Sequence, residues 1–238
     1  RAGLASALSA LGSVHGDLGD TALCERLYLQ SLALSEAIGD RRGMSAVLNN
    51  HGIVLKNQGK LDDARAMHER ALALRREIGD RNWSAISLNN IGVVLFEQDR
   101  LREAARYYTE AVALSREIGD KRNVVRALHN LAIVQRESGD LAAARASFEE
   151  AIPVRLELRD RRGEAISRVE LGTVLHAQGE LAAAAVALEQ TLAGARDIAF
   201  SEAEGYALFQ LGELALTRGD LAEARRQHEA ALAVRQRR

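Results

Sequence analysis

The sequence predicts an all-α solenoid of six antiparallel helix pairs, and three observations lead to this prediction. The chain divides, without a gap, into six similar blocks of equal period, which begin at positions 1, 41, 81, 121, 161 and 201. Each block holds two apolar patterns with the 3.6-residue period of an amphipathic helix. Short connectors rich in Gly and Asp separate these patterns, so neighbouring helices must run antiparallel. One helix pair cannot bury its apolar faces alone, and we therefore expect the pairs to stack into a single domain. The expected repeats cover residues 1–40, 41–80, 81–120, 121–160, 161–200 and 201–238.

Several positions of the block keep one kind of residue in all six copies. The first helix carries a small residue at Gly12, Gly52, Gly92, Ala132, Gly172 and Gly212. The second helix carries a small residue at Cys24, Ala64, Ala104, Ala144, Ala184 and Ala224, and a larger one at Tyr28, His68, Tyr108, Phe148, Leu188 and His228. A mid-helix Gly costs about 0.5–1 kcal/mol relative to Ala. We expect Gly52 and Gly92 to face Ala64 and Ala104, which lets the paired helices approach closely. Cys24 is interpreted as a buried packing residue, with a reactive thiol as the alternative.

The connectors contain the residues that end one helix and begin the next. Gly19, Gly59, Gly139, Gly179 and Gly219 suit the left-handed position that ends a helix. Asp20, Asp140 and Asp220 follow as N-caps of the second helices, and the Ile-Gly-Asp segments at 38–40, 78–80 and 118–120 serve the connections between repeats. The only proline, Pro153, falls inside a predicted helix and is expected to kink it.

Composition excludes several classes of function. Lys+Arg 32 against Asp+Glu 33 gives a formal net charge of −1, so nucleic acid and anionic membranes are not expected partners. The single cysteine excludes an internal disulfide and a cysteine-based zinc site. No metalloprotease, Cys-x-x-Cys or phosphate-loop motif occurs, so we predict no enzyme activity, no cofactor and no metal. No apolar run spans a membrane and no signal peptide is recognisable, which predicts a cytoplasmic location. The first residue is Arg1, and we expect the chain to be a piece of a longer protein.

The repeated positions resemble the tetratricopeptide repeat along essentially the whole chain. That pattern places Leu-Gly in the first helix, then Ala, an aromatic residue and Ala in the second. The third block fills these places with Leu88, Ile91, Gly92, Leu95, Ala104, Tyr108 and Ala111. Two departures are the period of 40 instead of 34 residues and the missing proline near the end of the second helix. The longer period resembles Pins-type scaffolds, kinesin light chains, and the repeats of bacterial signal-transduction ATPases and transcriptional regulators, and the REIGDRR-type connector favours the bacterial regulators. The resemblance implies a right-handed superhelix that binds a protein or an extended peptide non-catalytically in a concave groove.

In this family the first helices line the groove, which indicates the candidate site residues. They are polar, basic or apolar groups on the first helices of repeats two to four: Asn49, Asn50, Lys56, Asn89, Asn90, Val93, Phe96, Arg126, His129, Asn130 and Arg136. An amide both donates and accepts hydrogen bonds. Neighbouring helices lie about 8–10 Å apart and an extended peptide rises about 3.3 Å per residue, so one Asn per repeat meets a ligand at about every third residue. The basic edges lead us to expect a ligand with an acidic or polar half and an apolar half.

Three alternatives remain open. The Asn side chains can instead bond to neighbouring helices and stabilise the stack. The protein can self-associate through its terminal repeats, because we expect an open apolar edge at Ala230, Leu232 and Val234. It can also be a sensor of a small molecule or a short peptide within a transcriptional regulator. A carboxylate clamp for chaperone tails is not expected, because Asn49 and Asn89 stand where that clamp needs Lys.

Overall fold

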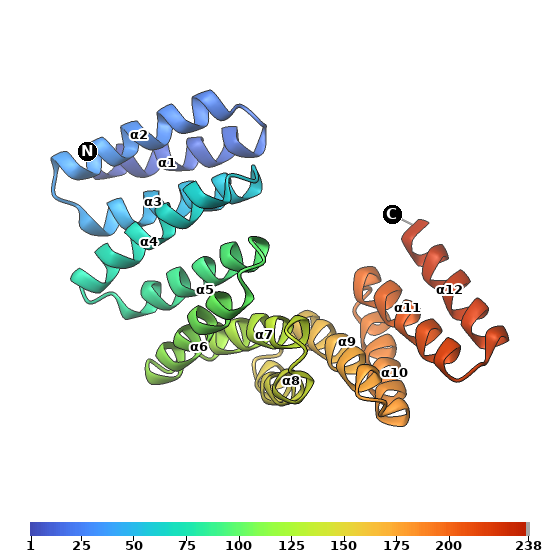
Figure 1. Cartoon of the computed structure of the whole chain (residues 1–238). Coiled ribbons are helices and arrows are strands. Elements are labelled where there is room, and N and C mark those ends of the chain that lie inside the picture. The colour runs from blue at the N-terminus through green and yellow to red at the C-terminus, as the bar shows by residue number, and fades with distance from the viewer. Residues whose placement is uncertain (237–238) are drawn as a thin grey trace. The chain divides into compact units, whose positions relative to one another are not determined.

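The computed structural model describes residues 1–236, and within this range it contains twelve α-helices and no strand (Figure 1). Each predicted repeat holds one helix pair. The helices are α1 (Ala2–Asp17), α2 (Thr21–Ala37), α3 (Arg41–Asn57), α4 (Leu61–Glu77), α5 (Arg81–Glu97), α6 (Leu101–Glu117), α7 (Lys121–Glu137), α8 (Leu141–Glu157), α9 (Arg161–Ala177), α10 (Leu181–Asp197), α11 (Ser201–Thr217) and α12 (Leu221–Gln236). The all-α class and the helix-pair packing are as predicted. In this part of the chain no helix combines the length and apolar character needed to cross a membrane.

The contacts divide the chain into two compact units, residues 1–123 and 124–238. Unit 1 holds the pairs α1–α2, α3–α4 and α5–α6, and unit 2 holds α7–α8, α9–α10 and α11–α12, with the boundary in the first turn of α7. In each unit the helices of a pair run antiparallel, and successive pairs stack side by side (Figure 1). We describe each unit by itself, and the single domain expected from the sequence stays a prediction.

The connectors repeat a left-handed residue every 20 positions. Eight glycines hold this conformation: Gly19, Gly39, Gly59, Gly79, Gly119, Gly139, Gly179 and Gly219. The same position is taken by Asp99, Arg159 and Ala199, whose φ angles are 58°, 55° and 51°. L-residues are strained in this region, by roughly 1–2 kcal/mol. These three positions therefore keep the connector geometry at a cost that glycine avoids.

The predicted Asp caps are confirmed. The carboxylate of Asp20 accepts a hydrogen bond from the amide of Leu23 at 3.1 Å. Asp140 and Asp220 accept from Ala143 and Glu223 in the same way, at 3.1 and 3.0 Å. Each bond satisfies one of the amides that the first turn of a helix leaves without an intrahelical partner.

The close approach within each pair has a different cause from the one expected. A Cβ on Gly52 would lie 2.8 Å from the ring of His68, and a Cβ on Gly92 would lie 2.6 Å from the ring of Tyr108. The small residue of the first helix therefore faces the large residue of the second helix of the same pair, and not the Ala column. The prediction that Gly52 and Gly92 face Ala64 and Ala104 was wrong because it ignored the ring, which occupies the space above each glycine.

The remaining local predictions have mixed outcomes. Cys24 is buried, with 2 % of its surface exposed, and belongs to a core cluster with Tyr28, Val47 and Val54, as a packing residue should. Burial raises the pKa of the Cys24 thiol. Pro153 lies inside α8, which is one uninterrupted helix from Leu141 to Glu157.

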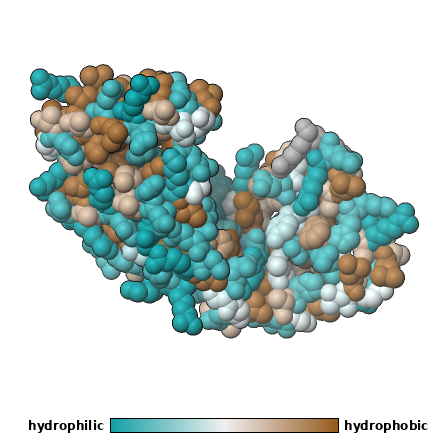
Figure 2. Space-filling model, turned by 45° about the horizontal axis from the view of Figure 1, so that its top comes forward, coloured by the Kyte–Doolittle hydropathy of each residue, from teal (hydrophilic) through white to brown (hydrophobic). Residues whose placement is uncertain are grey.

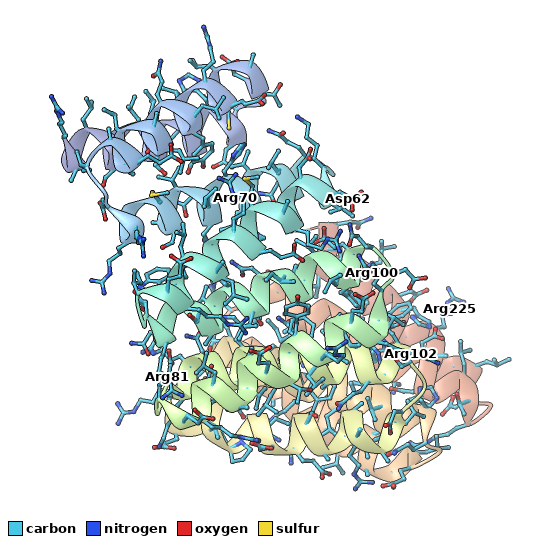
Figure 3. The ribbon with its side chains drawn as sticks, turned by 60° about the vertical axis from the view of Figure 1, so that its left-hand side comes forward. Asp62, Arg70, Arg81, Arg100, Arg102 and Arg225 are labelled. Atoms are coloured by element: carbon cyan, nitrogen blue, oxygen red, sulfur yellow. The ribbon has the colours of Figure 1, made fainter. Side chains whose placement is uncertain are left out.

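Ion pairs and polar contacts join the two ends of neighbouring helices in unit 1. Asp62, at the start of α4, accepts a hydrogen bond from Gln98 at 2.9 Å. Arg81, at the start of α5, pairs with Glu117, at the end of α6. Figure 3 shows Asp62 and Arg100 at one end of these helices and Arg81 at the other. Both partners of the Arg81 pair are more than half exposed, so it adds little to stability and mainly selects the register.

Apolar side chains are exposed on the first and last helices. On α1 they are Leu4, Leu11, Val14 and Leu18, and hydrophobic residues are visible on the N-terminal helices in Figure 2. On α12, Leu221 and Leu232 are 71 % and 56 % exposed. The expected open edge is corrected in part, because Val234 is buried and Ala230 half-buried, each packed with Leu208 of α11.

Candidate functional site

The first helices form a wall in each unit, and the predicted site residues lie on it. In unit 1 the wall comes from α3 and α5, and in unit 2 from α7, α9 and α11. Asn50, Asn90, Val93 and Phe96 are half-buried, and Ile53 is 40 % exposed. We call this set, from α3 and α5, the unit 1 wall. It combines two amides with three apolar side chains.

The Asn side chains of the unit 1 wall bond to the preceding repeat. Nδ2 of Asn90 donates a hydrogen bond to Oδ1 of Asn49 at 3.0 Å. Nδ2 of Asn50 donates to Oγ of Ser9 at 3.5 Å. Both bonds join residues 41 positions apart, because the period of the repeat places equivalent first helices side by side. The amide groups therefore stabilise the stack, which was one of the two alternatives.

The carbonyl halves of these two amides remain unused. Oδ1 of Asn50 and Oδ1 of Asn90 accept no hydrogen bond from residues 1–236. Since an amide oxygen has two lone pairs, each can accept from a ligand without breaking the bond to the preceding repeat. The structure thus allows both alternatives at once, stack bonding through nitrogen and ligand contact through oxygen.

Asn49 and Asn89 do not lie on the exposed surface where we expected them. They are only 5 % and 7 % exposed. Oδ1 of Asn49 also accepts from Nη1 of Arg75 at 3.5 Å. The reason is their place on the helix, one residue before Asn50 and Asn90, which turns them toward the partner helices. Asn49 therefore acts on the wall only through Asn90.

Arg75, which sequence reasoning missed, is the most buried charged side chain in unit 1. It is 1 % exposed, and its Nη1 donates to the carbonyl of Trp83 at 3.0 Å and to Ser87. No carboxylate lies within ion-pair distance among residues 1–236, and Nε has no hydrogen-bond partner. Burial lowers the pKa of Arg75 to about 10, with Asp80 opposing the shift. The guanidinium links α3, α4 and α5 beneath the wall.

The expected basic edges are neutralised by carboxylates. In unit 1, Nζ of Lys56 lies 3.1 Å from Glu97. In unit 2, Arg136 pairs with Glu170 and, at 2.8 Å, with Glu137. Neither residue offers an unopposed positive charge, so the expectation of an acidic ligand half loses its basis. Arg126 is exposed and has no ion-pair partner among the described residues.

His129 and Asn130 lie half-buried on α7 in unit 2. The His129 ring meets Phe148 edge-on, with 5.6 Å between centroids, and Nδ1 lies 3.4 Å from the Ser167 hydroxyl. Burial, then the charges of Arg155 and Arg136, lowers the pKa of His129 to about 4. The ring is therefore neutral at pH 7. Within residues 1–236 no group of three His, Cys, Asp or Glu side chains is placed to hold a metal ion.

Unit 2 also contains a cavity of about 590 Å³ that sequence reasoning missed. Its lining residues come from α9, α11 and α12: Ile166, Val169, Glu170, Ser201, Glu202, Ala203, Tyr206 and Arg235. Glu170 takes the position that Asn50, Asn90 and Asn130 hold in earlier repeats, and its pairing with Arg136 keeps it charged although burial raises the pKa of its carboxyl. The change from amide to carboxylate at this position was the signal in the sequence.

The comparisons with known proteins agree with this architecture. The tetratricopeptide repeat model matches residues 3–77, 43–117, 83–157 and 123–197, and a second model of the same repeat matches residues 205–230. These matches cover most of the chain, which therefore belongs to the tetratricopeptide repeat family. A comparison with curated protein sequences finds no significant match.

Several solved structures share the fold. BtubC (BKLC) from P. vanneervenii is 17 % identical with a TM-score of 0.77, over 98 % of this chain and 91 % of that chain. A signal transduction ATPase with numerous domains, with a tetratricopeptide repeat sensor, from Pyrococcus horikoshii is 16 % identical with a TM-score of 0.86, over 96 % of this chain and 36 % of that chain. A Rap protein complexed with competence and sporulation factor is 11 % identical with a TM-score of 0.68, over 98 % of this chain and 77 % of that chain. At these identities the likeness shows the fold alone.

Proposed function

We propose that this chain is a non-catalytic binding module that recognises an extended segment of a protein or peptide along its first-helix wall. Tetratricopeptide repeats are generally interaction modules, and two of the similar structures are a repeat sensor and a Rap protein in complex with a factor. By this analogy the chain is the sensor or scaffold segment of a cytoplasmic bacterial regulatory protein.

The observation that carries the proposal is the pair of unused amide oxygens. Asn50 and Asn90 occupy equivalent positions of adjacent first helices, and each has its nitrogen fixed by the preceding repeat. A fixed nitrogen orients the oxygen before any ligand arrives, which lowers the entropic cost of binding. Since these oxygens only accept, the ligand must present donors, and the backbone N–H groups of an extended peptide do so at regular intervals.

The apolar residues of the unit 1 wall indicate what else the ligand presents. Ile53, Val93 and Phe96 are partly exposed beside the two amides. Lys56 is paired with Glu97, so the charge of this wall is balanced. We therefore expect a segment with apolar side chains rather than an acidic one, held through its main chain by Asn50 and Asn90.

Selection of phage-displayed random peptides on the chain tests this proposal. A selected peptide should lose at least tenfold in affinity for the Asn50→Ala and Asn90→Ala double variant. It should retain its affinity for Arg102→Ala, a control whose exposed side chain lies on α6, outside the unit 1 wall (Figure 3). Methylating the peptide's backbone nitrogens one at a time should identify two positions that matter. Undiminished binding to the double variant would falsify the proposed role of the amides.

The unit 2 cavity favours a second candidate function, the sensing of a small molecule. Its volume of about 590 Å³ falls in the range of about 300–1,000 Å³ typical of ligand sites. Tyr206, Ile166 and Val169 supply apolar surface, and Glu170 supplies a charge. A thermal-shift screen with metabolites should then give a stabilising compound whose effect disappears in Tyr206→Ala. No shift across a broad panel would count against this second candidate.

A further inference from the structure

The first and last helices expose faces that are covered in the internal repeats. Val14 of α1 is 53 % exposed, whereas its equivalents Val54, Val94, Val134, Val174 and Leu214 are all at most 5 % exposed. Leu232 of α12 is 56 % exposed, whereas its equivalents Leu72, Val112 and Ile152 are at most 7 % exposed and Leu32 and Leu192 are half-buried. The internal copies are covered because the second helix of one repeat packs on the first helix of the next.

We propose that a second copy of this chain covers these faces, with α12 of one copy packing on α1 of the next as one more internal joint. The inference is independent of the proposed function. The blocks have a constant period, so a seventh block would begin at position 241, and Leu18 of a second copy takes the place of position 258 in a continued array. Every internal contact can therefore be shifted by whole repeats to the new joint.

Shifted in this way, the apolar contacts match. Within unit 2 the side chain of Arg218 lies on Leu181, where Nη2 donates to the carbonyl at 2.7 Å. The equivalent contact at the joint brings Leu18 of the second copy onto Leu221. These two leucines are 74 % and 71 % exposed. A leucine pair would thus bury two of the most exposed apolar side chains of the chain, which is a favourable use of apolar surface.

The charges match as well. Arg145 of α8 bridges Glu149 on its own helix at 2.8 Å and Glu180, just before α10, at 2.6 Å. Arg225 of α12 repeats the first half of this arrangement, with Glu229 at 2.7 Å. At the joint the equivalent of Glu180 is Asp20 of the second copy, just before α2. Arg225 is 80 % and Asp20 50 % exposed, and Figure 3 shows Arg225 on α12. An opposite charge therefore stands where the internal joint has one.

The contact is heterologous, because different surfaces of the two copies meet, so its direction is testable. Sedimentation of the full chain from micromolar to millimolar concentration should show association. Leu18→Asp and Leu221→Asp should each be monomeric, because each removes one of the two complementary faces. An equal mixture of these two variants should form a dimer and nothing larger, since one intact α1 face meets one intact α12 face.

Controls separate this result from misfolding. Both substituted leucines are more than two-thirds exposed, so circular dichroism should match that of the unaltered chain. Val186→Asp, an exposed apolar position of α10 away from both end faces, should associate like the unaltered chain. A monomer throughout the concentration range would overturn the proposal. So would a dimer of Leu221→Asp alone, since that would require two α1 faces to meet each other.

Discussion

Arg155 donates a hydrogen bond from Nη1 to Oδ2 of Asp160 at 2.6 Å, and the bond exists only because Gly163 has no side chain. A Cβ on Gly163 would lie 1.8 Å from Nη1 of Arg155 and 2.1 Å from Oδ2 of Asp160. Two repeats earlier, Trp83 takes the place of Gly163. There Arg75, the equivalent of Arg155, forms no ion pair with Asp80 and instead stacks on Trp83, with 5.2 Å to the ring centroid. One residue thus decides where the buried arginine goes.

Gly163→Ala should destabilise unit 2 by about 1–2 kcal/mol, because the guanidinium of Arg155 must leave its partner while most of it stays buried. The alanine's better helix propensity offsets part of this loss. The free energy of unfolding in urea measures the effect. Gly194→Ala is the matched control, since Gly194 is helical and a Cβ there would meet no atom within 4 Å. It should stabilise by about 0.5–1 kcal/mol. An equal effect at both sites would contradict the role given to Gly163.

Ala199→Gly should stabilise the protein by about 1 kcal/mol, because its φ of 51° lies in the left-handed region, where a non-glycine residue is strained by roughly 1–2 kcal/mol and glycine is not. Asp99→Gly should gain less, because Asp tolerates this region better than Ala does. The reverse change, Gly179→Ala, should lose about 1 kcal/mol. Thermal unfolding of the three variants ranks them, and a destabilised Ala199→Gly would show that the connector is not strained.

Pro153→Ala should stabilise α8 by about 2–3 kcal/mol, because a proline inside a helix removes one backbone hydrogen bond and crowds the preceding turn, at a cost of about 3 kcal/mol or more. Pro153 is exposed, so replacing its ring should remove little packing. Leu156→Ala, an exposed position in the same helix, serves as the control and should change stability little. If Pro153→Ala is neutral, the helix has already accommodated the proline without loss.

His68 should make stability depend on pH between about 6.5 and 4. Its side chain is 1 % exposed, and burial together with Arg75 and Lys56 lowers its pKa from 6.5 to about 4. The unfolded chain therefore takes up the proton first as pH falls, and the native state loses up to about 3 kcal/mol across this window. Above pH 6.5 the contribution is fully present.

The variant His68→Phe measures the histidine contribution. Urea unfolding at pH 7 and pH 4.5 should give a smaller difference for His68→Phe than for the unaltered chain. Phe148 occupies the equivalent position, so a phenyl ring is compatible with this site. The substitution also removes Nδ1 of His68, which is buried without a hydrogen-bond partner. His129, with a pKa lowered to about 4, should leave a residual dependence. An unchanged pH profile would show that His68 already titrates at its ordinary pKa.

The regular part of this fold follows from sequence because every copy obeys the same local rules. The Asp caps and the connector glycines act within a few residues, so the sequence around Asp20 or Gly59 is sufficient to predict them. Contacts between repeats are harder. Asn49 and Asn50 are the same residue type at consecutive positions, yet one is buried and the other reaches the wall, and only the rotation of α3 in its packed position decides this.

The charge of the candidate site was the least predictable part. Lys56 and Arg136 look free in the sequence, since their partners Glu97 and Glu170 lie 41 and 34 residues away. Arg75 and Arg155 have the same position in their repeats and take different partners because of Trp83 and Gly163. Such choices depend on the shape of a neighbouring side chain, which periodicity does not encode.

The constant spacing of the left-handed residues has a consequence for how the chain can change over generations. The helices from α2 to α11 are all equally long, and the left-handed residue recurs every 20 positions. Recombination between two similar copies of the repeat removes or adds one whole repeat. Because the cut ends then meet at equivalent positions, every cap and connector survives the event. Gene duplication and loss can therefore lengthen or shorten the binding wall in whole steps, while most other insertions would disturb the register of all later helices.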